Sequence, residues 1–197
     1  MTSKILWPNI HGKDTSMFVQ ISYTPNPKTI KFIPGLHVSD EPSEFRREDS
    51  SRHPFLEAVF EIEDVDLVFL GPDFVSVSIR DGADWDTGLK ENISGLIALF
   101  ADGLHQIKGK ALTAEVDPVG DARVVAKIKE LLESHVRPAV ASDGGDIIFK
   151  GFDEGVLTLE MRGACSGCPS STATLRHGIQ SLMRHFVPEV KEVRAAN

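Results

Sequence analysis

The order of apolar and polar positions along the chain predicts an N-terminal half built from two β-hairpins and two helices. Runs of β-branched and aromatic residues flank turns that contain Pro or Gly in residues 17–33 and 65–79, a pattern typical of hairpins. Apolar residues spaced by three and four predict a short helix from Pro54 and a longer one within residues 86–104. The charged segment 39–53 is expected to be a surface loop with no more than a turn of helix.

The C-terminal half shows the pattern of an α-β-β-α unit. A helix is predicted to start at Asp121, which suits an N-cap, and to end before Pro138. Two β-rich runs follow, at residues 146–152 and 155–163, with a short turn between them. An apolar stripe at helical spacing then predicts a last helix over residues 169–186.

Between the two halves, residues 106–120 lose the periodicity and contain two Gly and one Pro, so this segment is predicted to be a linker. The predicted organisation is an N-terminal domain over residues 17–105, the linker 106–120 and a C-terminal domain over residues 121–197. The fold class is α+β with two small domains. The first is hairpin-rich, and the second has the order α-β-β-α.

Composition and charge exclude several classes of function. The chain has 197 residues and a net charge of −8, which leaves little room for a basic face that binds phosphates, so nucleic acid is not expected as a partner. No apolar run approaches the roughly 20 residues that span a bilayer, so no membrane association is expected either. The sequence contains no P-loop, Gly-x-Ser-x-Gly or dinucleotide-binding motif, and the protein is therefore not expected to be an enzyme.

The candidate chemistry lies in the two cysteines of the chain, Cys165 and Cys168, which fall between the second predicted strand and the last predicted helix. Two cysteines at this spacing, in a chain of this size, indicate metal binding or redox chemistry in a reducing compartment such as the cytosol or an organelle matrix. The N-terminus of the following helix favours a bound anion. Both the thiolate of a redox pair and an iron–sulfur cluster fit that preference.

Three kinds of site are compatible with this loop. A thioredoxin-like dithiol also places C-x-x-C at a helix N-terminus, but a βαβ unit leads into that motif, whereas here a hairpin does. Structural zinc needs four ligands, and His177 and His185 on the following helix do not have the spacing of a zinc finger. In the third kind, two chains each contribute Cys165 and Cys168, so that four thiolates hold one cluster at a two-fold interface.

Two motifs around the cysteines, RPAVASDGGDI and GACSGCPSSTATL, closely resemble the C-terminal domain of the NifU-like (Nfu) family. The segments TPNPKTIKFIPG and HPFLEAVFEIEDVDLVFLGPDFVSVSI are similar to the Nfu N-terminal domain, so the resemblance covers nearly all of the chain beyond Met17. It implies a scaffold or carrier that binds a 4Fe-4S cluster between two protomers. The implied ligands are Cys165 and Cys168.

The resemblance also implies partners. An upstream assembly scaffold would supply the cluster, apo iron–sulfur client proteins would receive it, and the carrier would be a homodimer while it holds the cluster. The first 16 residues lack the features of a secretory signal and make a poor transit peptide. The protein is therefore expected in a bacterial cytoplasm, with the mitochondrial matrix, after loss of a presequence, as the alternative.

Overall fold

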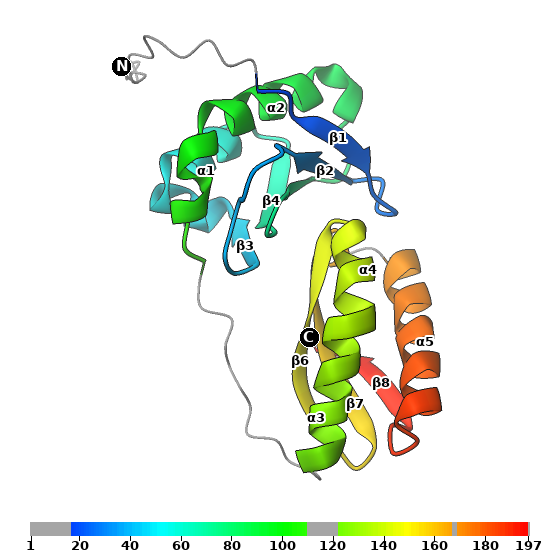
Figure 1. The fold of residues 1–197 in the computed structure, drawn as a ribbon. Coiled ribbons are helices and arrows are strands. Elements are labelled where there is room, and N and C mark those ends of the chain that lie inside the picture. Colours follow the sequence, from blue (N-terminus) through cyan, green and yellow to red (C-terminus); the bar gives the residue numbers. More distant parts are fainter. Residues whose placement is uncertain (1–16, 110–121, 167–168, 197) are drawn as a thin grey trace.

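The N-terminal domain is built on a five-stranded antiparallel sheet (Figure 1). The computed structural model describes residues 17–109, 122–166 and 169–196, so most of the predicted linker 106–120 lies outside the described residues and the exact domain boundaries stay a prediction. The strand order is β1-β2-β5-β4-β3, and both predicted hairpins are confirmed, because β1 pairs with β2 and β4 with β5. The strands are β1 (Gln20–Tyr23), β2 (Thr29–Ile33), β3 (Ser43–Arg46), β4 (Val65–Leu70) and β5 (Val75–Ile79).

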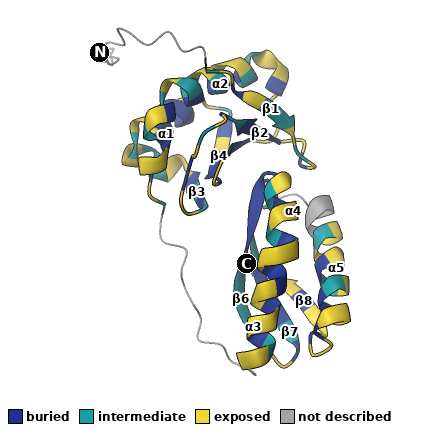
Figure 2. Ribbon diagram, in the orientation of Figure 1, coloured by how far each residue is buried: buried dark blue, intermediate teal, exposed yellow. Residues whose placement is uncertain are grey.

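Two helices cover one face of this sheet, and the core of the domain lies between the two layers (Figure 2). They are α1 (Pro54–Phe60) and α2 (Leu89–Leu99), both within the predicted helical segments. α1 starts at the predicted residue because Pro54 suits the first turn and His53 Nδ1 accepts a hydrogen bond from the Phe55 N–H at 3.1 Å. The largest fully buried side chains of this core include Phe32, Phe45, Phe55, Phe60, Ile93 and Ile97.

The charged segment 39–53 is not a simple surface loop. It contains β3, an edge strand that pairs with β4, followed by a 3-10 helix over Arg47–Arg52. The guanidinium of Arg47 donates hydrogen bonds to four backbone carbonyls between the end of α1 and the start of β4. These bonds hold the charged segment against the domain. Phe45 is its only buried large apolar residue, so the strand has no hydrophobic alternation that the sequence could reveal.

The C-terminal domain packs its helices on one face of a three-stranded sheet, and the two domains together confirm the α+β class (Figure 1). β6 (Gly145–Asp153) and β7 (Val156–Gly163) form the predicted hairpin, and α5 (Pro169–Phe186) is the predicted last helix. A short edge strand, β8 (Glu192–Ala195), pairs parallel to β7 and is absent from the predicted α-β-β-α order. Only Val193 of β8 is buried, so this strand has no apolar pattern of its own.

The first helix of this domain runs past Pro138, contrary to the prediction. α3 (Ala122–Leu131) continues through a π-helical turn, Leu132–Val136, into α4 (Arg137–Ser142). In the π turn the Arg137 N–H donates to a carbonyl five residues back instead of four. The wider turn accommodates the Pro138 ring, which has no N–H and would clash with the carbonyl of a regular helix, so the helix continues through the proline.

An ion pair joins this helical run to the start of β6. Arg137 donates to both carboxylate oxygens of Asp146, each at 2.9 Å, and to Glu133 at 2.7 Å. Asp146 is only 6% exposed. Its hydrogen bonds hold the pKa of the Arg137 guanidinium above the usual range, although burial acts in the opposite direction. The pair therefore ties α4 to the first residues of β6.

Replacing Asp146 with Asn should lower the free energy of unfolding of the C-terminal domain by about 2 kcal/mol, because it leaves the charge of Arg137 without its buried partner. Asp153→Asn, at the exposed end of the same strand, is the matched control and should change it by less than about 0.5 kcal/mol. Urea denaturation followed by circular dichroism measures both variants. Equal stabilities would contradict a stabilising role for the ion pair.

Candidate functional site

Cys165 lies in a tight turn between β7 and α5, as the sequence predicts. Gly163, the last residue of β7, has a left-handed φ of +62°, a conformation that favours glycine. Ser166 closes the turn, because its N–H and its hydroxyl both donate to the Gly163 carbonyl, at 3.0 and 2.9 Å. Cys168, the second predicted ligand, lies outside the described residues.

The start of β6 packs directly against the cysteine. Gly145 pairs with Gly163 across the hairpin, and a Cβ atom at Gly145 would lie 2.9 Å from Cys165 Sγ and 2.5 Å from the Arg162 carbonyl oxygen. Gly144, one residue earlier, has a φ of +81° and makes the turn from α4 into the strand. The glycines of the SDGGD segment thus allow the backbone to approach the thiol closely.

Cys165 is only 6% exposed and belongs to the apolar core of the C-terminal domain. A cavity of about 30 Å³ beside it has room for about one or two water molecules. Residues of both domains line this cavity: Pro25, Asn26, Asp143, Ala164, Cys165 and Leu175. The thiol therefore does not face open solvent in this conformation.

Charged residues of β6 and β7 form ion pairs with one another. Arg162 Nη2 and Lys150 Nζ lie 2.5 and 2.6 Å from the two carboxylate oxygens of Glu160. Burial raises the pKa of Glu160, but the two cations outweigh burial and hold this pKa below its usual range. The positive charge of Arg162, next to the cysteine turn, is thus engaged by Glu160.

The two histidines considered as zinc ligands, His177 and His185, lie on α5, and both are exposed. The ring of His185 packs edge-on against Phe186, with centroids 4.7 Å apart. Across residues 17–109, 122–166 and 169–196, no three His, Cys, Asp or Glu side chains come together in a group that could hold a metal ion.

Two side chains of the N-terminal domain hold the turn that carries Cys165. Asn26 Nδ2 donates to the Ala164 carbonyl at 3.0 Å, in a buried hydrogen bond, and Glu44 Oε2 accepts from the Gly163 N–H at 3.0 Å. The bonded residues are 138 and 119 positions apart in the sequence. Nothing in the sequence marks Asn26 or Glu44, because no local pattern indicates a contact between two domains.

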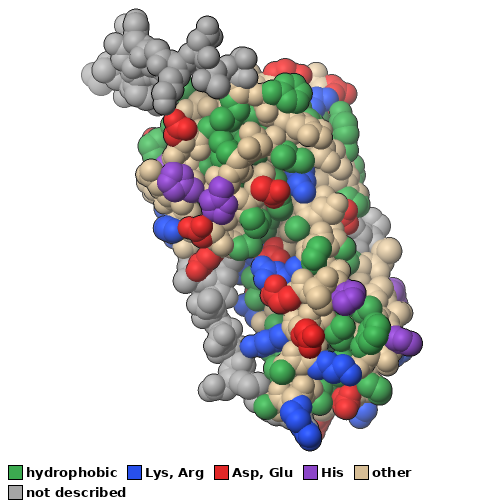
Figure 3. Space-filling view, viewed as in Figure 1, with side chains coloured by type: hydrophobic (Ala, Val, Ile, Leu, Met, Phe, Trp, Pro, Cys, Tyr) green, Lys and Arg blue, Asp and Glu red, His purple; other side chains and the backbone are tan. Residues whose placement is uncertain are grey.

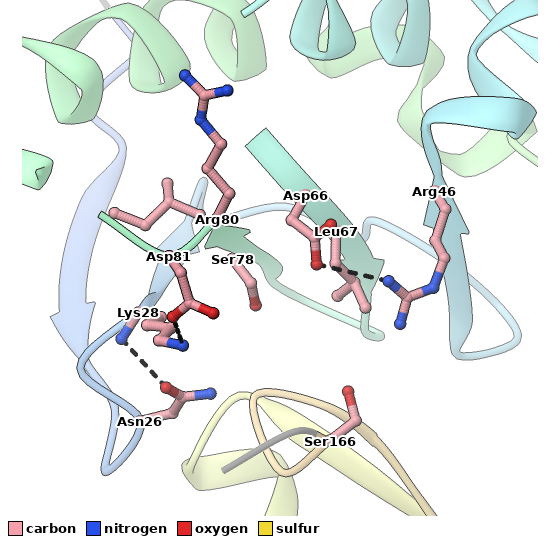
Figure 4. Close-up of a pocket in the computed structure, with 10 residues that line it drawn as sticks. Asn26, Lys28, Arg46, Asp66, Leu67, Ser78, Arg80, Asp81 and Ser166 are labelled. Atoms are coloured by element: carbon pink, nitrogen blue, oxygen red, sulfur yellow. Dashed lines mark hydrogen bonds and ion pairs between the residues drawn. The ribbon is translucent and has the colours of Figure 1, made fainter. Parts of the chain in front are cut away.

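A larger cavity, of about 310 Å³, lies beside Ser166 between the two domains (Figure 4). The N-terminal domain lines most of this cavity. Its charged side chains form ion pairs there, Lys28 with Asp81, and Arg46 with Asp66 at 3.4 Å. Acidic and basic side chains are also interspersed over the visible surface of the C-terminal domain (Figure 3). The surroundings of the turn therefore carry mixed charge and not a field of one sign.

Two family models match the chain, in the order of its two domains. The model described as "Scaffold protein Nfu/NifU N terminal" matches residues 19–103, and the model described as "NifU-like domain" matches residues 128–194. A solved structure, the solution NMR structure of a NifU-like protein from Saccharomyces cerevisiae, covers 55% of this chain and 100% of its own, with 18% identity and a TM-score of 0.44. Both halves of the chain thus match domains of the same family.

Curated relatives extend over both domains. An "NFU1 iron-sulfur cluster scaffold homolog, mitochondrial" from Drosophila sechellia is 37% identical over 182 residues, which are 90% of this chain and 64% of the relative. The protein of the same name from Homo sapiens is 39% identical over 180 residues, which are 90% of this chain and 71% of the relative. The chain thus spans slightly less than two thirds of the length of the fly relative.

The expected location in a bacterial cytoplasm is wrong. Both relatives are named mitochondrial, which contradicts it. The expectation relied on the composition of the first 16 residues and on the reducing compartment that the cysteine pair indicates. In the part of the chain that the structure describes, no helix has the length and apolarity needed to cross a membrane.

Three observations agree on the family. The motifs around Cys165 and Cys168 resemble it, and its two domain models match in the right order. The human relative is 39% identical, with 71% of its length covered. The chain therefore belongs to the Nfu family of NifU-like proteins.

Proposed function

We propose that this protein is a non-enzymatic iron–sulfur cluster carrier, which binds a 4Fe-4S cluster between two copies of the chain and passes it to apo-proteins. The observation that carries the proposal is the number and place of its thiols, because the chain has two cysteines and both fall between β7 and α5. A cluster takes four cysteine thiolates. Two chains supply them if each contributes Cys165 and Cys168. The name of the relatives, iron-sulfur cluster scaffold, supports the same cargo.

The loop between β7 and α5 suits an anionic cargo. A cluster bound by four thiolates is negatively charged, and the N-terminus of a helix attracts negative charge. α5 begins at Pro169, which follows Cys168 directly in the chain. On the other side of the loop, Gly145 places no side chain against Cys165 Sγ, so the backbone of β6 supports the thiol without crowding it.

Delivery of the cluster is an exchange of ligands. Each thiol of the carrier releases its proton when it binds iron and takes one up again when it leaves. A cysteine thiolate of the client replaces one carrier thiolate at a time, until all four ligands belong to the client. Because one sulfur ligand replaces another, the cluster is neither oxidised nor reduced. The same exchange, with an upstream assembly scaffold as the donor, loads the carrier.

Replacing Cys165 or Cys168 with Ser should abolish cluster binding, because a dimer then keeps only two of its four thiolates. Visible absorption and iron analysis after anaerobic reconstitution measure the loss. Ser166→Ala is the matched control, because it changes the same loop but keeps the backbone hydrogen bond to the Gly163 carbonyl, and it should load normally. Unfolding of both cysteine variants, detected by circular dichroism, would point to a structural metal instead.

Native mass spectrometry of the unmodified chain, after anaerobic reconstitution with equal amounts of ferrous and ferric iron and with sulfide, should show a dimer with one adduct of four iron and four sulfide atoms. This stoichiometry follows from two thiolates per chain. A monomer that carries one zinc ion or no metal would contradict the carrier. Catalytic reduction of a disulfide substrate in the absence of iron would favour the thioredoxin-like dithiol.

A further inference from the structure

The contact between the two domains covers the turn that carries Cys165, and its apolar part comes from the second face of the N-terminal sheet (Figure 1). Along β4, Val68 and Leu70 belong to the core beneath α1 and α2, whereas Leu67 and Phe69 point to the opposite face. These two side chains are buried in a small cluster with Phe74, and Ala141 of α4 packs against this cluster. The C-terminal domain therefore covers an apolar strip of the N-terminal sheet.

Hydrogen bonds fix this contact on both sides of the apolar cluster. Lys31 Nζ donates to the Ala141 carbonyl at 2.7 Å, near the C-terminus of α4, where a helix favours a cation. Asn26 and Glu44 bond to the backbone of the cysteine turn. All three side chains come from the N-terminal domain, and all three bond to the backbone of the C-terminal domain. The contact thus recognises the conformation of that backbone.

Glycines of the C-terminal domain make the fit close. A Cβ atom at Gly163 would lie 2.9 Å from Phe69 Cγ, and one at Gly144 would lie 2.7 Å from Ser76 Oγ. Cβ atoms essentially never come so near to other heavy atoms, and both glycines have a positive φ. A side chain at either position would therefore separate the two domains at the cysteine turn.

A cluster does not fit in the space that the described residues leave beside Cys165. The cavity next to the thiol holds about one or two water molecules, whereas the cargo has four iron and four sulfide atoms. Pro25 and Asn26 of the N-terminal domain form part of the wall of this cavity. The described conformation is thus closed to the cargo.

We propose that Asn26 and Glu44 form a latch that keeps the cysteine turn closed, and that the N-terminal domain leaves the turn before Cys165 binds iron. The inference rests on the proposed function only for the identity of the cargo. A few hydrogen bonds and a small apolar cluster make the kind of contact between domains that opens readily. The Ser76 hydroxyl also favours opening, because it is buried in the contact without a hydrogen-bond partner among the described residues and would gain water as a partner.

The test measures the rate at which iodoacetamide alkylates Cys165 in the full chain carrying Cys168→Ser, which leaves a single thiol. Asn26→Asp is the decisive variant. The new carboxylate has the same shape and still accepts the Lys28 N–H, a bond of 3.1 Å in the parent, but it cannot donate to the Ala164 carbonyl and repels it. We expect alkylation about tenfold faster than in the parent, because the rate follows the open population.

Two control variants separate the latch from general effects of charge and folding. Asn92→Asp adds the same charge at an exposed position of α2 and should leave the alkylation rate unchanged. Glu44→Gln keeps an oxygen that accepts the Gly163 N–H and should react like the parent, whereas Glu44→Ala removes this acceptor and should react severalfold faster. Circular dichroism should give the same spectrum for every variant.

Equal alkylation rates in Asn26→Asp and Asn92→Asp would overturn the latch, whatever the cluster experiments show. The proposed function fails separately, if the unmodified chain takes up no cluster at all. With Cys168 restored, Asn26→Asp should acquire the cluster from ferrous iron, ferric iron and sulfide faster than the parent. An equal or slower rate would overturn the second half of the proposal, that opening precedes loading.

Discussion

The pairing of Gly145 with Gly163 decides where the thiol of Cys165 lies. These two residues are the first of β6 and the last of β7, and the missing side chain at Gly145 allows Cys165 Sγ to rest against the strand. Arg137 and Asp146 in turn fasten the start of β6 to the helical run that precedes it. The hairpin, the helix and the cysteine turn are therefore tied into one unit, and the N-terminal domain meets that unit at its glycines.

Local patterns were sufficient for most of the fold. The two hairpins, α1 and α5 formed where alternation, helical spacing and turn residues indicated, because that information lies within a few neighbouring positions. β3 and β8 were missed because each has four residues and one buried large apolar side chain, and each depends on a strand from elsewhere in the chain. The predicted end of the helix before Pro138 was wrong for another reason. The π turn that accommodates this proline does not show in the spacing of the apolar residues.

The cysteine pair was visible in the sequence because its spacing and its motif are contiguous, but the surroundings of Cys165 were not. Asn26 reaches the turn from a position 138 residues away from its partner, and only the packing of one domain on the other brings them together. Glu44 was overlooked because its segment is charged, and charged segments are usually solvated. Here that segment forms an edge strand, and one of its carboxylates bonds to the other domain.

The backbone of the cysteine turn can form hydrogen bonds either with the N-terminal domain or with water. The difference in free energy between the closed and the open form decides which of the two occurs. In the closed form, Glu44 and Asn26 satisfy its peptide groups, and Leu67 and Phe69 are shielded from water. After opening, water can take over the peptide hydrogen bonds, so that the loss of each costs only about 0.5–1.5 kcal/mol. The larger penalty is then the exposure of the apolar cluster, which amounts to about 1.5–3 kcal/mol for each side chain that becomes fully exposed. Without cargo only the hydration of the Ser76 hydroxyl acts against this penalty, whereas two bonds between thiolate and iron in each chain can exceed it, so the cargo itself selects the open form.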